Sequence, residues 1–244
     1  MTVTVFTRDS ARHIALVNKL ATVTNAVRAV IESSPPSVTA PPKSPVMTEY
    51  FSRVRQAEDH IFGTGTTLDP RVKVQSIVAG QLNQLTQQQL AAALESDLVV
   101  VFGSSYIKDW LADALIAKNA VNLHMGISPQ YRGSACNFWA LFDNNPHLVG
   151  ATIHRLAKSL DSGSVIQHVR LKFTDQNLFH FSMQAVAAGH DALASLISNN
   201  QLQTMTPQPQ DSSLKIRYSK NADFTDEIAA SFLKRVNNPS GHSF

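Results

Sequence analysis

The sequence of 244 residues predicts an α/β fold: an open, mostly parallel, twisted sheet with helices on both faces, followed by a short C-terminal α/β appendage. Three observations lead to this prediction. The chain opens with a strand pattern, a helix pattern and a second strand pattern. The continuous apolar run "LVVVF" at 98–102 is typical of a central parallel strand buried on both faces. Helix and strand patterns then alternate, as expected for a parallel sheet with crossover helices.

Each element is predicted from its hydrophobic period. Thr86 is expected to cap a helix made of good helix formers. The proline-dense stretch 33–45 is predicted to be an inserted loop, because proline interrupts the interior of helices and strands. The predicted strands are 3–6, 26–31, 72–78, 98–102, 120–124 and two alternating runs within 147–157 and 164–173; the predicted helices are 10–22, 47–62, 86–97, 107–117, one from about Ser134, 176–198 and 225–236.

Composition bounds the class of protein. Apolar residues make up 43% of the chain and charged residues 16%, which indicates a globular protein rather than a disordered one. We expect one catalytic domain over residues 1–200 and an extension over 201–244 that serves dimerisation. No apolar run approaches the about 18 residues that a membrane helix needs. The first charged residues are Arg8 and Asp9, close to the start of the sequence, so no secretory signal is expected.

Charge and cysteine content exclude several functions. Cys136 is the single cysteine, which rules out a disulfide within the chain and a cysteine-based zinc site. His147, His168, His180 and His190 lack ligand spacing, so no metal site is expected. The net charge of +3 is mild and its basic residues are scattered, which argues against nucleic-acid binding although the isoelectric point is about 9.1. We expect a cytoplasmic protein that binds a small molecule.

The stretch "NLHMGISPQYRG" at 122–133 places two polar side chains where a buried strand ends. A polar strand end followed by an ordinary turn would produce the same pattern. In open α/β sheets, however, ligands bind at the carboxyl ends of the strands, near a switch in strand order. Phe102–Ser105 and His124–Gly126 both fall at such ends. Asn122 and His124, two apart on a strand, point to the same side.

This stretch is followed by "NFWAL", "VGATIH" and "LDSGSVI", and together the four blocks resemble the folate-dependent formyltransferase family. The resemblance is sharp over residues 97–170. It implies a Rossmann-like formyltransferase fold and transfer of a formyl group from N10-formyltetrahydrofolate to a primary amine. It also implies three catalytic residues: Asn122 as a hydrogen-bond donor to the formyl oxygen, His124 to stabilise that oxygen or move a proton, and Asp161 to orient His124 or a water and collect the proton of the amine.

The resemblance also suggests how the ligands are held. The folate is expected along the ends of the strands at 98–102 and 120–124, with backbone groups as partners. The folate-binding residues expected from this arrangement are Phe102, Gly103, Ser104, Ser105, Leu160 and Gly163. The candidates for the acceptor side are Arg8, Arg12, His13, Tyr106 and Arg132. Pro129 is expected to set the backbone of the turn, and Arg132 to hold the loop in place.

One block departs from the family pattern. Gly126-Ile127-Ser128-Pro129 stands where the family usually has Ser-Leu-Leu-Pro, and we expect the glycine to loosen the turn. His154 fits either packing or a supporting role behind the catalytic residues. Cys136 and Trp139 are expected to be helix core without a chemical role.

Absent features narrow the acceptor. The first strand is followed by "TRDSARH", without the glycine-rich phosphate loop of glycinamide ribonucleotide enzymes. Little chain follows residue 200 to form the C-terminal barrel of methionyl-tRNA formyltransferases. The layout is similar to that of the sugar-nucleotide N-formyltransferases, which implies a dTDP- or GDP-linked amino sugar as acceptor and a homodimer. Two alternatives stay open: the same chemistry on another amine (an amino acid, a peptide or a ribonucleotide amine), and a non-catalytic relative that binds folate or nucleotide.

Overall fold

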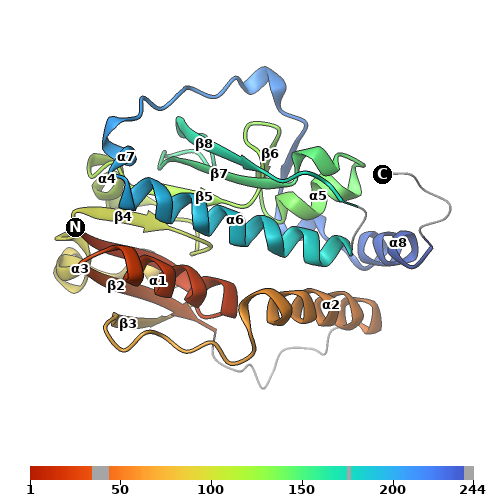
Figure 1. Cartoon of the computed structure of the whole chain (residues 1–244), viewed down its shortest axis with the longest axis horizontal. Coiled ribbons are helices and arrows are strands. Elements are labelled where there is room, and N and C mark those ends of the chain that lie inside the picture. Colours follow the sequence, from red (N-terminus) through yellow and green to blue (C-terminus); the bar gives the residue numbers. More distant parts are fainter. Residues whose placement is uncertain (35–43, 175–176, 239–244) are drawn as a thin grey trace.

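A seven-stranded sheet, in the order β3-β2-β1-β4-β5-β7-β8, runs through the computed structural model (Figure 1). The structure describes residues 1–34, 44–174 and 177–238. The neighbouring strands β3, β2, β1, β4 and β5 pair in parallel, and the pairs β5–β7 and β7–β8 are antiparallel. The strands are β1 Thr2–Arg8, β2 Ala26–Ser33, β3 Lys73–Val78, β4 Leu98–Val101, β5 Val121–His124, β7 Gly150–Arg155 and β8 Val165–Arg170.

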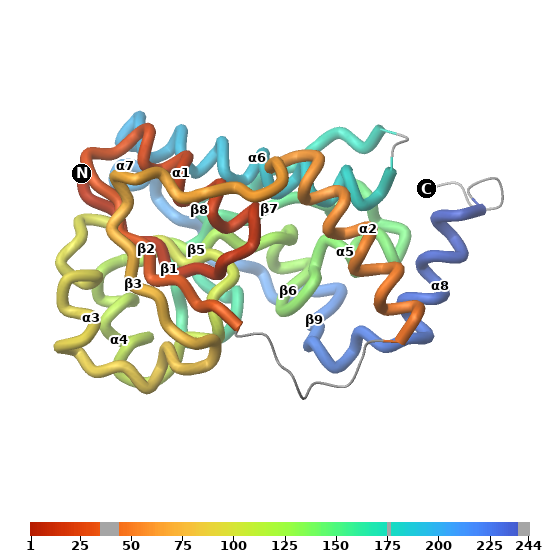
Figure 2. The backbone as a smooth tube through the Cα atoms, turned by 90° about the horizontal axis from the view of Figure 1, so that it is seen from below, coloured from red at the N-terminus to blue at the C-terminus, as the bar shows by residue number. Residues whose placement is uncertain are grey.

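Helices cover both faces of this sheet. Figure 2, viewed along the sheet, shows α1 and α6 on one side and α3 and α4 on the other. Strand β2 shows why: Ala29 and Ile31 belong to the core under α1 and α6, whereas Val30 belongs to the core under α3 and α4. The helices are α1 Ala11–Val23, α2 Pro45–Phe62, α3 Gln87–Leu94, α4 Asp109–Ala117, α5 Cys136–Phe142, α6 Leu178–Ser198, α7 Gln201–Thr204 and α8 Asp226–Asn237.

The predicted fold class is confirmed, and most predicted elements are found within a few residues of their expected bounds. Thr86 caps α3 as predicted: its side chain accepts a hydrogen bond from the N–H of Gln89, and the Gln89 side chain returns one to the Thr86 N–H. The predicted insertion at 33–45 falls mostly on residues 35–43, which lie outside the described residues.

The sequence did not reveal a second, two-stranded parallel sheet. It pairs β6 (Tyr131–Gly133), directly after the turn of the opening motif, with β9 (Arg217–Ser219) of the C-terminal extension. Short strands with mixed burial carry little periodic signal, so only the tertiary pairing defines them. As a result, the extension lies beside the loop that leaves β5.

The C-terminal extension packs into the same core as residues 1–200. Phe224 and Phe232 join Tyr50 of α2 in an aromatic cluster, with ring centroids 4.7 and 6.3 Å from that of Tyr50. Phe232 and Leu233 of α8 are buried. Burying aromatic rings at this junction stabilises the attachment. Its predicted role in dimerisation stays a prediction.

Candidate active site

A cavity that the described residues form lies at the carboxyl ends of β1, β4 and β5. The chain adds β2 and β3 on one side of β1 and then returns to add β4 on the other side, so the strand order switches between β1 and β4. A crevice therefore opens there. The cavity has a volume of about 690 Å³, within the usual range for small-molecule sites. Its walls combine apolar side chains such as Phe102 and Leu123 with Asn122, His124 and Asp161.

The three catalytic residues predicted from the sequence come together on one wall of this cavity. Asn122 and His124 both belong to β5. Asp161 arrives from the loop between β7 and β8, where it adopts a left-handed backbone with φ of 51°. Its Oδ2 lies 3.3 Å from Nδ1 of His124 and accepts a hydrogen bond of 2.9 Å from the N–H of Gly133. Its Oδ1 accepts one of 3.2 Å from Nδ2 of Asn122.

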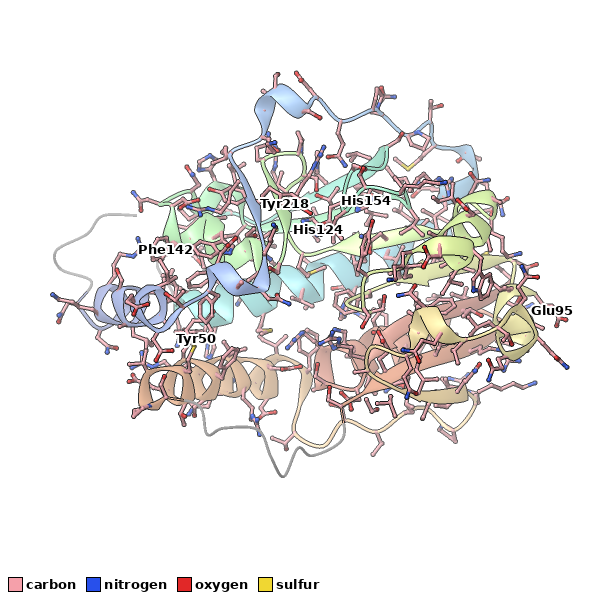
Figure 3. All side chains as sticks on the ribbon, turned by 180° about the vertical axis from the view of Figure 1, so that it is seen from behind. Tyr50, Glu95, His124, Phe142, His154 and Tyr218 are labelled. Atoms are coloured by element: carbon pink, nitrogen blue, oxygen red, sulfur yellow. The ribbon has the colours of Figure 1, made fainter. Side chains whose placement is uncertain are left out.

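His154 is a fourth member of this cluster, and of the two roles that the sequence left open for it, packing or support, its contacts fit support of the catalytic residues. It is 1% exposed, and its Nε2 lies 3.1 Å from Nδ2 of Asn122 and 3.8 Å from Oδ1 of Asp161. Nδ1 of His154 lies 2.7 Å from the carbonyl oxygen of Arg155 and therefore carries the proton in the neutral ring. Figure 3 shows His124 and His154 near each other.

The register between β5 and β7 explains why His154 joins the site. Asn122 and His154 are direct partners in this antiparallel pair. The two side chains therefore project from the same face of the sheet. The "ATIH" alternation would have identified His154 if the pairing of the two strands had been known.

Both amide hydrogens of Asn122 have acceptors within the cluster. One points to Nε2 of His154 and the other to Oδ1 of Asp161. An amide nitrogen has only two hydrogens to donate. Donation from Asn122 to a substrate oxygen therefore requires that one of these two bonds be exchanged when the substrate binds.

Burial and charge set the protonation of the His124–Asp161 pair. Burial lowers the pKa of His124, against the raising effect of the Asp161 charge, so the imidazole is neutral near pH 7. Burial would raise the pKa of Asp161, but His124, His154 and the Gly133 N–H outweigh it and lower this pKa to about 2. The pair thus combines a neutral base with an ionised carboxylate.

Gly126 is tightly packed, which corrects the expectation of a looser turn. A Cβ added at this position would lie 2.5 Å from Cβ of Cys136 and 2.8 Å from Nε2 of His124. The glycine therefore allows α5 and the imidazole to approach closely. The neighbouring Ser128 is fully buried, and its Oγ has no hydrogen-bond partner among the described residues.

The loop after β4 forms the wall expected to face the folate, and all four of its predicted residues line the cavity. Some of its backbone groups are already engaged. The N–H of Phe102 donates to Phe6, and the carbonyl oxygen of Phe102 accepts from Thr7. The N–H of Ser105 donates to the buried carboxylate of Glu32 at 2.5 Å. Backbone recognition by this wall is therefore left mainly to Gly103 and Ser104.

Glu32 anchors this wall and was not predicted as a site residue. It is 1% exposed, and its second carboxylate oxygen accepts a 3.0 Å hydrogen bond from the N–H of Gly80. The side chain joins the loops after β3 and β4. Because Glu32 is buried away from water, its hydrogen bonds to the two backbone N–H groups hold the loops after β3 and β4 in place.

Four of the predicted acceptor-side residues line the cavity: Arg8, Arg12, His13 and Tyr106. Arg12 donates to the buried Glu58 through its backbone N–H and its guanidinium, which holds the side chain in place. Burial, Arg12 and Arg8 lower the pKa of His13 well below its usual value. His13 is thus a neutral ring beside Phe102, and the positive charge at this rim comes from the two arginines.

Tyr106 is 53% exposed, and its hydroxyl donates a 2.6 Å hydrogen bond to the carbonyl oxygen of Lys158. This bond joins the loops that follow β4 and β7. Leu160 lines the cavity as expected.

The other two predicted residues are not among the described residues that line the cavity. The Arg132 guanidinium donates to Oε1 of Gln210, which agrees with a role in holding the loop. Gly163 packs so closely on Arg155 that an added Cβ would lie 1.7 Å from its carbonyl oxygen. Gly163 thus shapes the Asp161 loop from behind.

Two further observations concern the described residues only. They contain no group of three or more histidine, cysteine, aspartate or glutamate side chains placed to hold a metal ion. Within the same ranges, no helix has both the length and the apolar character needed to cross a membrane.

Comparison with known proteins identifies the family. The profile described as "Formyl transferase" matches residues 10–193. Among solved structures, a 4-N formyltransferase from Francisella tularensis is 16% identical, with a TM-score of 0.57, over 91% of this chain and 77% of the other. An N-formyltransferase from Helicobacter canadensis, in complex with folinic acid and dTDP-3-aminofucose, is 12% identical, with a TM-score of 0.57, over 94% and 78%.

Phosphoribosylglycinamide formyltransferase from Bacillus halodurans is 17% identical, with a TM-score of 0.55, over 82% of this chain and 95% of its own. At these identities the structural likeness establishes the shared fold, whereas the family profile covers most of the sequence. The resemblance found in the motifs at 122–164 is confirmed. The chain belongs to the formyl transferase family and is an enzyme of the folate-dependent formyltransferase class.

Proposed function

We propose that this enzyme transfers a formyl group from N10-formyltetrahydrofolate to the amino group of a nucleotide-linked deoxy-amino sugar. The observation that carries the proposal is the cluster of Asn122, His124 and Asp161 on the wall of a cavity of about 690 Å³. The family match supports the reaction, and the charged rim of the cavity supports the acceptor class.

In this proposal His124 is the base. Its neutral imidazole accepts the proton that the amine loses when it attacks the formyl carbon. The bond from N10 of the folate to that carbon then breaks, and N10 leaves with a proton returned by the imidazolium. A neutral ring can donate to only one of its two neighbours, the Asp161 carboxylate and the Tyr131 carbonyl oxygen. The protonated ring donates to both, so the site stabilises the form that the reaction creates. Asp161 orients the ring and balances its charge.

Asn122 is proposed to stabilise the negative charge that develops on the formyl oxygen. Its amide would exchange the bond to Oδ1 of Asp161 or to His154 for one to this oxygen. His154 then positions Asn122, because its Nε2 accepts from the same amide nitrogen.

The formyl donor would lie against the wall formed by Gly103 and Ser104 and by Leu160 in the facing loop. The cavity lining also includes the apolar side chains of Val101, Ile107, Leu156 and Val186, which offer apolar contact to the faces of a pterin ring. When bound, N10-formyltetrahydrofolate supplies an activated formyl group.

The acceptor is proposed to lie toward Arg8 and Arg12, which carry the positive charge of the rim. A nucleotide sugar brings a diphosphate, and guanidinium groups bind phosphate oxygens in paired hydrogen bonds. Two of the structural neighbours support this acceptor class, since they were solved with dTDP-3-aminofucose and with UDP-4,6-dideoxy-4-formamido-L-AltNAc.

The experiment incubates the purified protein with N10-formyltetrahydrofolate and a panel of dTDP-, GDP- and UDP-linked amino sugars, and follows the mass gain of one formyl group. One sugar that gains the group supports the whole proposal. If folate binds but only another amine is formylated, the acceptor class is wrong and the catalyst stands. Failure of 5-formyltetrahydrofolate to bind in calorimetry would contradict the proposed donor.

We also propose that the enzyme is a cytoplasmic homodimer. The dimer proposal is supported by three exposed apolar residues in and before β9: Leu214, Ile216 and Tyr218 are 52%, 53% and 48% exposed. Ile216→Asp should shift the mass measured by light scattering toward the monomer. An unchanged mass would place the interface elsewhere or show that the chain is monomeric.

A further inference from the structure

Gln210 links the C-terminal extension to the loop that carries Asp161. Its Nε2 donates a hydrogen bond of 2.8 Å to the carbonyl oxygen of Asp161 and one of 2.7 Å to that of Gly163. Its Oε1 accepts two bonds from the guanidinium of Arg132, at 3.1 and 2.7 Å. Every hydrogen of the Gln210 amide thus has an acceptor, and the side chain is half-buried.

The Asp161 backbone needs such support. Its φ of 51° lies in the left-handed region, which residues other than glycine adopt at a cost. The surrounding structure must therefore hold this conformation. Gln210 clamps the backbone on both sides of Ser162. Because the loop backbone sets the direction of the side chain, the clamp also sets the distance from Oδ2 of Asp161 to His124.

The carbonyl oxygen of the Gln210 side chain contacts the segment that binds the Asp161 carboxylate. Arg132 belongs to β6, and the next residue, Gly133, donates its N–H to Oδ2 of Asp161. Gln210 therefore joins the loop that carries Asp161, through two carbonyl oxygens, to the segment that binds its carboxylate, through the Arg132 guanidinium. Figure 1 shows the chain between α7 and α8 running past β8 and β6 along this side of the molecule.

We propose that Gln210 is a positioning residue for formyl transfer, acting from the C-terminal extension on Asp161. The region that matches the family ends at residue 193, so this contact is a feature of the part of the chain beyond that match. The inference rests on the proposed role of Asp161. It assigns to the extension a part in catalysis besides its packing through Phe232.

Gln208 provides a matched control. It lies on the same segment, its backbone pairs with Val165, and its side chain reaches only the carbonyl oxygen of Thr206 in the described structure. Gln210→Met keeps the length of the side chain and removes all of its hydrogen bonds. Gln210→Glu keeps acceptors for Arg132 but loses both donors to the Asp161 loop. Gln208→Met makes the same chemical change outside the clamp.

The first readout is steady-state kinetics of formyl transfer. Gln210→Met and Gln210→Glu are expected to lower kcat by about 10- to 100-fold with little change in the donor KM, because a small displacement of a catalytic group slows the reaction without weakening binding. Gln208→Met should retain the parent kcat. Equal kcat values for Gln210→Met and Gln208→Met would overturn the proposal.

The second readout is the titration of the His124 ring, followed by NMR with nitrogen-15 in the imidazole, and it does not need an acceptor. The groups that face His124 are Asp161, His154, Arg132 and the Tyr131 carbonyl. The Asp161 charge raises the pKa of His124, so a displaced carboxylate should lower it. Gln210→Met is expected to move this pKa in the direction of the Asp161→Asn variant, and Gln208→Met to leave it unchanged.

The two readouts separate this inference from the proposed function. Full activity of Asp161→Asn would contradict the catalytic assignment, while the titration still reports whether Gln210 holds the carboxylate. If Asp161→Asn loses activity but Gln210→Met changes neither kcat nor the titration, the positioning role is wrong and the function stands. If the parent formylates no amine, the titration alone decides.

Discussion

Oδ2 of Asp161 lies 3.3 Å from Nδ1 of His124, while the other ring nitrogen lies 3.1 Å from the carbonyl oxygen of Tyr131. The imidazole thus has an acceptor at each nitrogen although, near neutral pH, it carries one proton. An acceptor at each nitrogen favours the uptake of a second proton by His124.

His124→Ala should lower kcat by roughly 10²- to 10⁴-fold, the usual effect of losing a positioned acid–base group. The measurement is formyl transfer under saturating donor, with circular dichroism to confirm folding. His147→Ala serves as the control, because His147 is exposed and lies outside the cavity lining. Near-normal turnover of His124→Ala would contradict the role of His124.

The pH dependence should follow the neutral form of His124. Burial lowers the pKa of this ring, so kcat/KM is expected to persist below the usual histidine range of about 6.5 and to fall only at more acidic pH. Asp161, with a pKa of about 2, stays ionised throughout this range. In Asp161→Asn the acid limb should move further toward low pH, because the charge that raises the pKa of His124 is gone. A limb that moves to higher pH would contradict this assignment.

Gly126→Ala should reduce both stability and activity. The new Cβ would lie 2.5 Å from Cβ of Cys136 and 2.8 Å from Nε2 of His124, so α5 or the imidazole must move. Overpacking of this kind costs about 1–3 kcal/mol of unfolding free energy. Cys136→Gly removes the nearer atom. In thermal melts the double variant should therefore lose less stability than the sum of the losses of the two single variants. Additive losses in the double variant would show that the clash lies elsewhere.

Ser128→Ala should leave the protein equally stable or raise its unfolding free energy by about 1 kcal/mol, because it removes a buried hydroxyl without a partner among the described residues. Thr152→Val is the contrasting variant. The Thr152 hydroxyl accepts from the N–H of Ser128 and donates to the carbonyl oxygen of Gly126. Its loss should lower the unfolding free energy by about 1–3 kcal/mol in urea titrations. The opposite order would show that Ser128 has a buried partner.

His190 should make the protein sensitive to acid. It is 1% exposed, and burial together with Lys19 lowers its pKa to about 3. A group whose pKa is depressed by folding contributes stability that is present above its unfolded pKa, near 6.5, and is lost as pH falls toward 3. His190→Leu should therefore show a smaller difference in Tm between neutral and acidic pH than the parent.

The matched control for His190→Leu is His147→Leu, which changes an exposed histidine. It should keep the parent difference in Tm across the same pH range. If His190→Leu also keeps that difference, the buried ring is not the source of the acid sensitivity.

Much of the candidate site could be predicted from local sequence. Asn122 and His124 share one strand, so the alternation of side chains brings them together without any knowledge of the fold. Asp161 came from the resemblance to the family, and so did the acceptor-side candidates Arg8, Arg12, His13 and Tyr106. These residues do line one cavity.

The contacts that His154, Glu32 and Gln210 make in the site could not be predicted in this way. His154 meets Asn122 through an antiparallel register, Glu32 meets Ser105 across two loops, and Gln210 approaches Asp161 from the C-terminal extension. Their contacts depend on which strands pair and where a distant segment lies. A single sequence holds no periodic signal for such pairing.

The sequence by itself determined the α/β class, the order of most elements, the reaction family and the three residues proposed for catalysis. These depend on hydrophobic periods and short motifs, which are local. The tertiary structure alone decided the antiparallel β5–β7 register, the β6–β9 sheet and the left-handed backbone of Asp161. Such features arise from hydrogen bonds and packing between segments far apart in the chain, and these contacts form only when the core assembles.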